Sequence, residues 1–183
     1  MNTLKKIGMK RKWIYEGVLQ TAWSGAAKRK RNYAPMGYWS DDLKLVKIKA
    51  YDGSKTAENL ARMKKGEKAK LYLPDEIGAV FWAYFGKFRP GKNVSKIGLE
   101  KMRSERGKKF AVYSFKPTEM ALAMGAKVLT REPWIALETL IYCTKPWAKK
   151  AVLKSSLRTL KKVAPNSKFA GVLERLLERN KAL

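Results

Sequence analysis

The sequence predicts an α+β protein, with a β-barrel-like body in residues 1–129 and a helical C-terminal unit in residues 130–183. Short runs rich in β-branched and aromatic residues fill most of the first half, and several alternate between apolar and charged side chains, as strands do. From Thr130 onward, apolar residues recur at helical spacing instead. Strands followed by helices along a chain favour an α+β arrangement.

The expected strands follow one another through the body. Residues 13–23 and 32–39 are rich in aromatic and β-branched side chains, and a turn-prone basic loop separates them. Residues 43–51 alternate with a one-residue slip in phase, which suggests a β-bulge. Residues 68–73 alternate again, and residues 77–86 are apolar on both faces, as a central strand would be.

Three further segments complete the body. Residues 54–66 carry two alanines and a leucine at helical spacing and end in a glycine, which predicts a helix. Residues 87–109 are basic and glycine-rich with few apolar side chains, so we expect a long loop or an insertion with a helical turn. Residues 109–129 supply more strand material, although the segment TEMALAMG within them could be helical.

Three helices are expected after the body. Thr130 can cap the first helix, whose first turn holds Glu132 and Pro133. Its expected buried stripe is Ile135, Leu137, Leu140 and Ile141. The second helix lies within residues 147–165, and its expected apolar side is Val152, Leu153, Leu157 and Leu160. A third helix is expected within residues 167–180.

The chain is strongly basic. Its 41 lysines and arginines face 15 acids, which gives a formal net charge of +26. The basic residues gather at 1–12, 28–31, 87–109 and 145–162. Such a field attracts polyanions, for example nucleic acid or a ribosomal surface, but a solvated basic surface without a partner is the more ordinary explanation.

Several kinds of chemistry are excluded by composition. The chain has no histidine, so catalysis through a serine–histidine or cysteine–histidine pair is impossible, and so is histidine–metal ligation. Cys143 is the one cysteine, and the acids are scattered, so we expect no metal site. No catalytic residue is assigned, and any reaction would be carried by a cofactor. Without a membrane-spanning run or an export signal, we expect a cytoplasmic protein.

Two short stretches suggest binding. In YDGSKTAENL, a glycine is followed by Ser54, Lys55 and Thr56 at the start of the expected helix. The spacing of a nucleotide P-loop is absent, which leaves either an ordinary serine cap or a cradle for an anion. The second stretch, Ala34 to Gly37, places a proline and a glycine in a strand, which is typical of an edge strand with a bulge.

The aromatic residues of the body are expected to lie mostly in its core rather than in stacking positions. The five concerned are Trp13, Tyr15, Trp39, Trp82 and Tyr84.

Several motifs, in their order along the chain, resemble one known family. They are YEG, NYAPMG, DGSKTAENL, YLPDEIGAVFWAYF and REPWIALETLIYCTK. Together they resemble the FMN-binding split-barrel proteins of domain-of-unknown-function family 447, distant relatives of flavin reductases and pyridoxamine-phosphate oxidases. Each motif is short, but the likeness covers nearly the whole chain.

The resemblance implies a split β-barrel that binds FMN. The FMN phosphate would lie at the helix start, held by Ser54, Lys55, Thr56 and Asn59. The isoalloxazine ring would lie beside the backbone of Pro35, Met36 and Gly37, where small residues such as Ala34 let a flat ring approach, and Asn32 would hydrogen-bond nearby.

Two functions follow as expectations. The first is an FMN-dependent oxidoreductase of unknown substrate, which the resemblance implies is a homodimer. The alternative is a highly basic protein that binds nucleic acid or the ribosome on the same scaffold. Membrane binding is not expected, because the apolar stripes of the C-terminal helices have ordinary core width.

Overall fold

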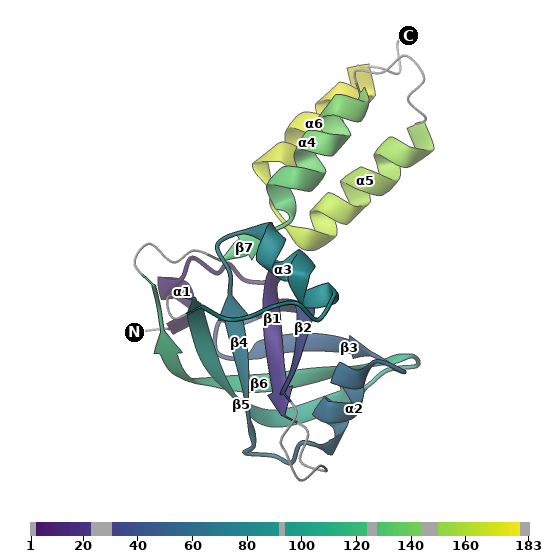
Figure 1. Ribbon diagram of the computed structural model, residues 1–183. Coiled ribbons are helices and arrows are strands. Elements are labelled where there is room, and N and C mark those ends of the chain that lie inside the picture. Colours follow the sequence, from purple (N-terminus) through teal and green to yellow (C-terminus); the bar gives the residue numbers. More distant parts are fainter. Residues whose placement is uncertain (1–2, 23–30, 92–93, 124–127, 144–149, 180–183) are drawn as a thin grey trace. The chain divides into compact units, whose positions relative to one another are not determined.

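The computed structural model describes residues 3–22, 31–91, 94–123, 128–143 and 150–179 (Figure 1). The chain divides into two compact units. The first comprises Met1–Arg11 and Tyr15–Leu129, and the second comprises Lys12–Ile14 and Thr130–Leu183. The two-residue strand β7, Leu129–Thr130, lies at their boundary.

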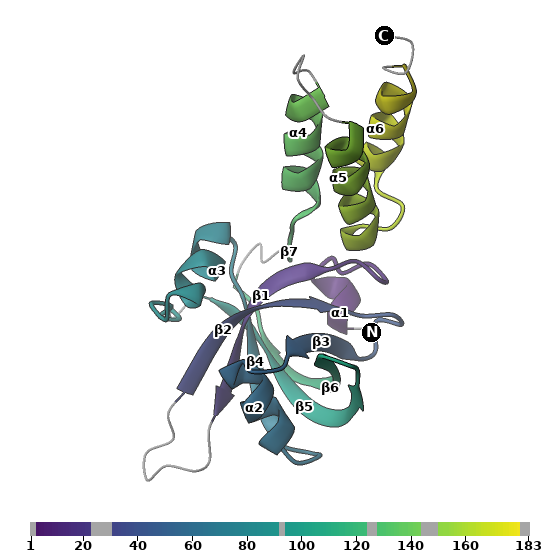
Figure 2. The ribbon, with the colours of Figure 1, turned by 90° about the vertical axis from the view of Figure 1, so that its right-hand side faces the viewer.

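The first unit contains a closed barrel of six antiparallel strands (Figures 1 and 2). Neighbouring strands follow the order β2-β3-β6-β5-β4-β1, and pairing of β1 with β2 closes the circle. The strands are β1 (Tyr15–Ala22), β2 (Arg31–Trp39), β3 (Val46–Tyr51), β4 (Lys68–Leu73), β5 (Ser95–Arg106) and β6 (Phe110–Ala121). The β-barrel-like body expected from the sequence is therefore confirmed.

Alternation along each strand fills the barrel interior. In β3, Val46, Ile48 and Ala50 are buried, while Lys47 and Lys49 between them are only half-buried. The largest fully buried side chains of the barrel strands are Tyr38, Phe115, Leu19, Ile48, Leu71, Ile97, Leu99 and Val46, together with Val18, which is buried on the outer face. Each large apolar side chain buried in this way stabilises the fold by about 1.5–3 kcal/mol.

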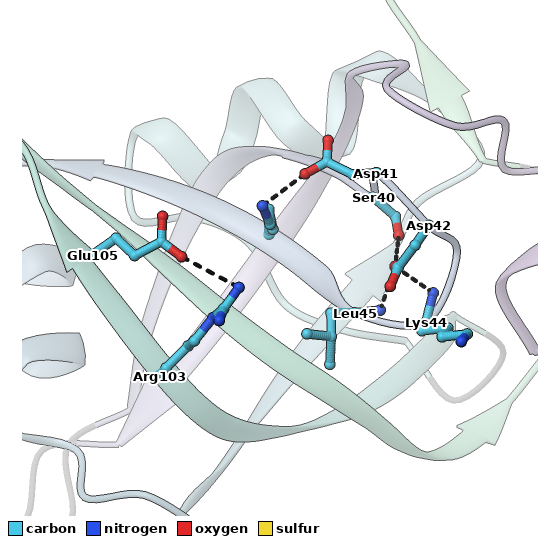
Figure 3. A network of polar contacts seen from close by, with 8 residues as sticks. Ser40, Asp41, Asp42, Lys44, Leu45, Arg103 and Glu105 are labelled. Carbon is cyan, nitrogen blue, oxygen red and sulfur yellow. Dashed lines mark hydrogen bonds and ion pairs between the residues drawn. The ribbon is translucent and has the colours of Figure 1, made fainter.

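The turn between β2 and β3 corrects the expectation of a bulge within residues 43–51. β3 begins only at Val46, so the slip in phase marks the end of a turn. Leu43 has a φ of 62°, and the Asp42 carboxylate accepts hydrogen bonds from the amides of Lys44 (2.8 Å) and Leu45 (3.2 Å) (Figure 3). Beside it, Asp41 forms an ion pair with Lys47 at 2.6 Å.

Helices α1 (Thr3–Lys6), α2 (Lys55–Arg62) and α3 (Ile77–Tyr84) belong to the first unit. The helix expected at residues 54–66 is confirmed as α2, which ends earlier than expected, at Arg62. The central strand expected at 77–86 is wrong, because this segment forms α3. A segment that is apolar on all sides has no period that distinguishes a strand from a helix.

The burial of α3 corrects a second expectation. Ala83 and the following Phe88 are buried against Val18 and Tyr72 on the outer face of the barrel. Trp82 and Tyr84, which were expected in the core, are exposed instead. Of the other aromatics expected there, Trp13 and Tyr15 are buried and Trp39 is half-buried.

The long loop expected at residues 87–109 is also wrong. β5 runs from Ser95 to Arg106 and pairs with β4 on one side and β6 on the other. At residues 110–121 the chain forms β6, so Thr118–Ala121 is strand rather than helix. The last residues of the segment TEMALAMG lie outside the described part of the chain.

The second unit contains α4 (Glu132–Cys143), α5 (Lys150–Val163) and α6 (Lys168–Arg179). Its described core is formed by Ala136, Leu160, Ala170 and Leu173, with Ile135 and Leu157 packed against it. The three N-terminal residues of this unit are tied to the end of α5. The Ile14 amide donates to the Val163 carbonyl, and the Trp13 indole donates to the Pro165 carbonyl, both at 2.8 Å.

Two details of these helices differ from expectation. α4 begins one residue later than a cap at Thr130 implies, although the Thr130 hydroxyl accepts a hydrogen bond from the Glu132 amide. Val152 is exposed rather than buried. The side chains of Leu137, Leu140 and Ile141 lie outside the described part of the structure. Among the described helices, none has the length and apolar character needed to cross a bilayer.

Candidate functional site

The barrel has an open strand edge along most of β2. Residues Arg31 to Tyr38 pair one-to-one with Tyr15 to Ala22 of β1, without a register shift. On the other side, the described pairing of β2 with β3 involves only Tyr38 and Trp39. The bulge expected at Ala34–Gly37 is therefore absent, but the edge expected there is present. Backbone groups on such an edge need water or a ligand as partners.

The start of α2 is organised by Ser54. Its hydroxyl accepts a hydrogen bond from the Ala57 amide (3.1 Å) and donates one to the Tyr51 carbonyl (2.8 Å), so it is a helix cap. The Glu58 amide donates to the Ser54 carbonyl. Within the described residues, this leaves the amides of Lys55 and Thr56 without a partner at the positive end of the helix dipole.

A polar network connects this helix start to the β2 edge. Asn32 donates through Nδ2 to the Thr56 hydroxyl at 3.1 Å, and Asn59 donates through Nδ2 to the Thr21 hydroxyl at 2.9 Å. Thr21 and Asn32 are direct neighbours across the β1–β2 pair. The Thr56 oxygen accepts from Asn32, so the Thr56 hydroxyl keeps its own proton to donate.

The charges around the helix start favour an anion, with the exposed Glu58 of the first turn as the opposing charge. Gly53, with a φ of 77°, turns the chain into the helix, and among the described residues no atom beyond its chain neighbours lies within 4 Å of the position that a Cβ would take there. Lys55 is exposed beside it. The preceding carboxylate, Asp52, is engaged by the two terminal nitrogens of Arg106 at 2.7 and 3.0 Å, which neutralises its charge.

The other end of α2 is capped by a buried lysine. Lys101 of β5 donates through Nζ to the carbonyls of Leu60 (2.7 Å) and Met63. Burial lowers the pKa of Lys101, and the negative charge of Glu67 opposes this shift. A cation at the C-terminal end of a helix complements the dipole whose positive end lies at Lys55.

The sequence-predicted site residues are thus placed in two adjoining groups. Asn32, Thr56 and Asn59 meet in the polar network, with Ser54 and Lys55 exposed at the same helix start. The four residues of the second group, Ala34 to Gly37, lie on the half-exposed edge strand that carries Asn32. Asn59 is buried against Thr21, so within this arrangement its amide holds the helix in place.

Sequence reasoning missed Thr21 and Lys101. Thr21 could have been found from the hairpin register, because it lies opposite Asn32, but that register depends on the length of the intervening loop. No local signal distinguishes Lys101 from the many other lysines, because its role depends on the contact of β5 with the end of α2.

Comparison with solved structures identifies the fold. An FMN-bound protein of domain-of-unknown-function family 447 from Methanosarcina mazei superimposes with a TM-score of 0.54 at 15% identity, covering 96% of this chain and 98% of its own. An FMN-binding protein from Thermus thermophilus matches with a TM-score of 0.45 at 12% identity, and the match covers 61% of this chain and 71% of that protein. A flavoredoxin from Methanosarcina acetivorans matches with a TM-score of 0.46 at 9% identity, and the match covers 63% of this chain and 72% of that protein.

The split-barrel fold with a C-terminal helical region is therefore confirmed, and the first of these proteins belongs to the family that the sequence resembles. No family model matches the chain, and no curated protein matches it.

Proposed function

We propose that the barrel binds FMN, with the phosphate at the start of α2. The observation that carries this proposal is the pair of unpartnered amides at Lys55 and Thr56, joined to the open edge of β2 by the Asn32–Thr56 hydrogen bond. Two orphan amides, a threonine hydroxyl and a lysine at a helix start are donors that suit a phosphate. The fold likeness to an FMN-bound protein over nearly the whole chain supports the same ligand.

The isoalloxazine ring would lie along the open edge of β2. Its rim carries hydrogen-bonding groups, and the backbone groups of Pro35 and Gly37 can satisfy them. Backbone groups alternate between the two sides of a strand, so these two residues face the open side while Met36 pairs with β1. Pro35 contributes only a carbonyl, since proline lacks an amide hydrogen. The absence of bulky side chains at Ala34 and Gly37 leaves room for a flat ring.

Bound FMN would supply two-electron redox chemistry by accepting or donating a hydride at its N5 atom. The residues of this chain would orient the cofactor and hold its phosphate. The nearby backbone amides and basic residues would favour the extra negative charge of the reduced ring. We propose an oxidoreductase on these grounds, and its substrate is left open.

The helix cap provides a sharp test of the phosphate position. Ser54→Asp preserves a capping oxygen for the Ala57 amide but adds a negative charge beside the proposed phosphate. Ser54→Asn caps equally well and is neutral, so it serves as the matched control. We expect Ser54→Asp to weaken FMN affinity about tenfold or more, since like charges at this range repel by about 1–4 kcal/mol.

Affinity is measured by titrating apoprotein with FMN and following the quenching of flavin fluorescence. Mass spectrometry of the small molecules released from the purified protein identifies the native ligand independently. Equal FMN affinity in the two Ser54 variants would place the phosphate elsewhere. Purified protein that neither contains nor takes up FMN would contradict the proposed function itself.

Two further properties are proposed with this function. We expect a homodimer, as the family resemblance implies, and light scattering on the holoprotein gives its mass. We also expect the protein in the cytoplasm, which fractionation with a specific antibody can check.

A further inference from the structure

A cluster of exposed aromatic side chains lies at the end of α3, the helix that packs against β1 and β2. Trp82, Tyr84 and Phe85 are 50%, 76% and 53% exposed. The Phe85 ring contacts both of the others, with centroid separations of 6.4 Å to Trp82 and 5.3 Å to Tyr84. Three large exposed rings in one contiguous group are unusual on a protein surface and mark a binding surface.

Cations accompany these rings. The Lys87 ammonium lies 5.4 Å from the centroid of the Trp82 ring. The Arg89 guanidinium donates to the carbonyls of Gly86 and Phe88, which holds it against the same turn. No acid occurs from residue 77 to residue 99, and the acids that precede α3, Asp75 and Glu76, stand at the opposite end of the helix. The cluster is therefore both aromatic and positively charged.

The basic surface continues from this turn onto the barrel. Phe88 packs on Tyr72 of β4 at 5.7 Å between ring centroids, and Lys96 of β5 is the cross-strand neighbour of Tyr72. Lys70, two residues from Tyr72 along β4, lies on the same outer face. Here a cavity of about 240 Å³ is lined by Lys70, Lys96, Gly98, Glu119, Met120 and Ala121.

We infer that this surface, from Trp82 to the cavity where Lys70 and Lys96 outnumber the one acid, Glu119, binds single-stranded RNA. RNA is recognised mainly through unpaired bases that stack on aromatic side chains, and the phosphates between them pair with lysine and arginine. The exposed rings provide stacking faces, Lys87 and Arg89 flank them, and Lys70 and Lys96 extend the path for the phosphate backbone. A protein partner or a second copy would require only the rings, whereas RNA accounts for the rings and the cations together.

The inference extends beyond FMN binding and is tested without reference to it. The ligand is a fluorescently labelled uridine oligonucleotide of about ten nucleotides, and its affinity is measured by fluorescence anisotropy. We expect the double variant Trp82→Ala/Tyr84→Ala to bind it about tenfold more weakly or worse, because each stacked base contributes measurably. Inorganic polyphosphate, which has charge but no bases, should bind the variant and the wild type equally.

The matched control is Trp134→Ala/Phe169→Ala, which removes two rings of similar exposure (55% and 48%) from the helical unit. It should bind the oligonucleotide as the wild type does. Lys87→Gln/Arg89→Gln should make the slope of log affinity against log salt shallower by about 1.4, since each phosphate contact on a single strand contributes about 0.7. The control Lys64→Gln/Lys65→Gln changes the net charge equally at a distant turn and should leave that slope unchanged.

Three results would overturn the inference. The first is equal RNA affinity in the wild type, the aromatic variant and its control. The second is a loss of polyphosphate binding that matches the loss of RNA binding, since the rings would then act only on the fold. The third is a dimer that becomes monomeric when Trp82 and Tyr84 are removed, which would assign the rings to an interface between copies of the chain.

Discussion

Asp42 shows how a single exposed carboxylate can organise the turn between β2 and β3. Its oxygen accepts two backbone hydrogen bonds in the turn that connects the edge strand β2 to β3 (Figure 3). The hydrogen bond from the Lys44 amide lowers the pKa of Asp42, and burial opposes this only in part. The ionised form of this residue therefore stabilises the turn more than the protonated form does.

Because the pKa of Asp42 is lower in the folded state, its contribution to stability is complete above its unfolded pKa of about 3.9 and is lost as pH falls through the folded value. Asp42→Ala should lower the free energy of unfolding at neutral pH by about 1–2 kcal/mol, since two backbone bonds are lost. It should also flatten the decline in stability below about pH 4. Urea denaturation across this pH range measures both effects.

The comparison for this variant is Asp41→Asn, which removes only the surface ion pair with Lys47. Exposed pairs of this kind contribute about 0–1 kcal/mol, so its effect at neutral pH should be smaller and should depend on salt. If Asp42→Ala cost no more than Asp41→Asn and left the acid limb unchanged, the turn would not depend on Asp42.

At the level of residues, three side chains expected near one another, Asn32, Thr56 and Asn59, do lie close together, but the sequence did not predict what each one contacts. Ser54 was open to two interpretations, a cap or a phosphate ligand, and its hydroxyl is in fact engaged as a cap. The pairing of Asn32 with Thr56 depends on a contact across 24 positions of sequence, which no local pattern encodes.

Among the elements, α2 is organised from both ends. Ser54 caps its first turn, and Lys101 binds the carbonyls of its last turn. A short helix has little stability of its own, so its position beside β2 depends on such tertiary contacts. The orientation of its first amides, which the FMN proposal requires, therefore depends partly on a lysine at the far end.

Lys101→Met should loosen α2 while keeping the buried volume nearly unchanged. We expect a loss of about 1–3 kcal/mol in the free energy of unfolding, since hydrogen bonds to a charged group are removed, with relief of the desolvated charge as an opposing effect. Hydrogen exchange should become faster in residues 55–63, and FMN affinity should fall with it. Exchange in β4, which has no contact with Lys101 Nζ, provides the internal reference.

The replacement Lys68→Met, at an exposed position of β4, controls for the loss of a charge. If Lys101→Met accelerated exchange no more in α2 than in β4, the lysine would stabilise the barrel generally rather than cap the helix.

The wrong predictions for β5 and α3 have a common physical reason, because in both segments the apolar pattern of the sequence does not match the pattern of burial. In β5 the inward positions carry Ile97, Leu99 and then Lys101, so a buried charge interrupts the alternation that would have shown a strand. In α3, large apolar side chains also cover the side that faces solvent, for example Trp82 and Tyr84. Hydrophobicity therefore did not indicate which side of the helix packs against the barrel. β4, where alternation and burial agree, was predicted to the residue.

For the whole molecule, charge is the dominant property. Fifteen acids cannot balance 41 basic residues, and the excess of +26 is spread over a chain of 183 residues. A net charge this far from zero destabilises the compact state by self-repulsion, and dissolved salt screens that repulsion. The screening length falls from about 30 Å at 0.01 M to about 10 Å at 0.1 M salt and about 3 Å at 1 M.

The thermal stability of the protein should therefore rise with salt. We expect the midpoint of unfolding to increase by roughly 5 °C between about 0.01 M and 0.5 M potassium chloride, which corresponds to relief of about 1–2 kcal/mol for a chain of this size. Sodium chloride should have the same effect, because screening depends on ionic strength. Sucrose at matched osmolarity is the control that distinguishes charge screening from solvent exclusion.

In the same range of salt concentration, RNA affinity should fall steeply, since salt competes for the phosphates. A midpoint that stayed constant or fell would mean that the positive charges are neutralised within the folded protein or by a retained polyanion, and treatment of the sample with nuclease before the measurement distinguishes these two cases.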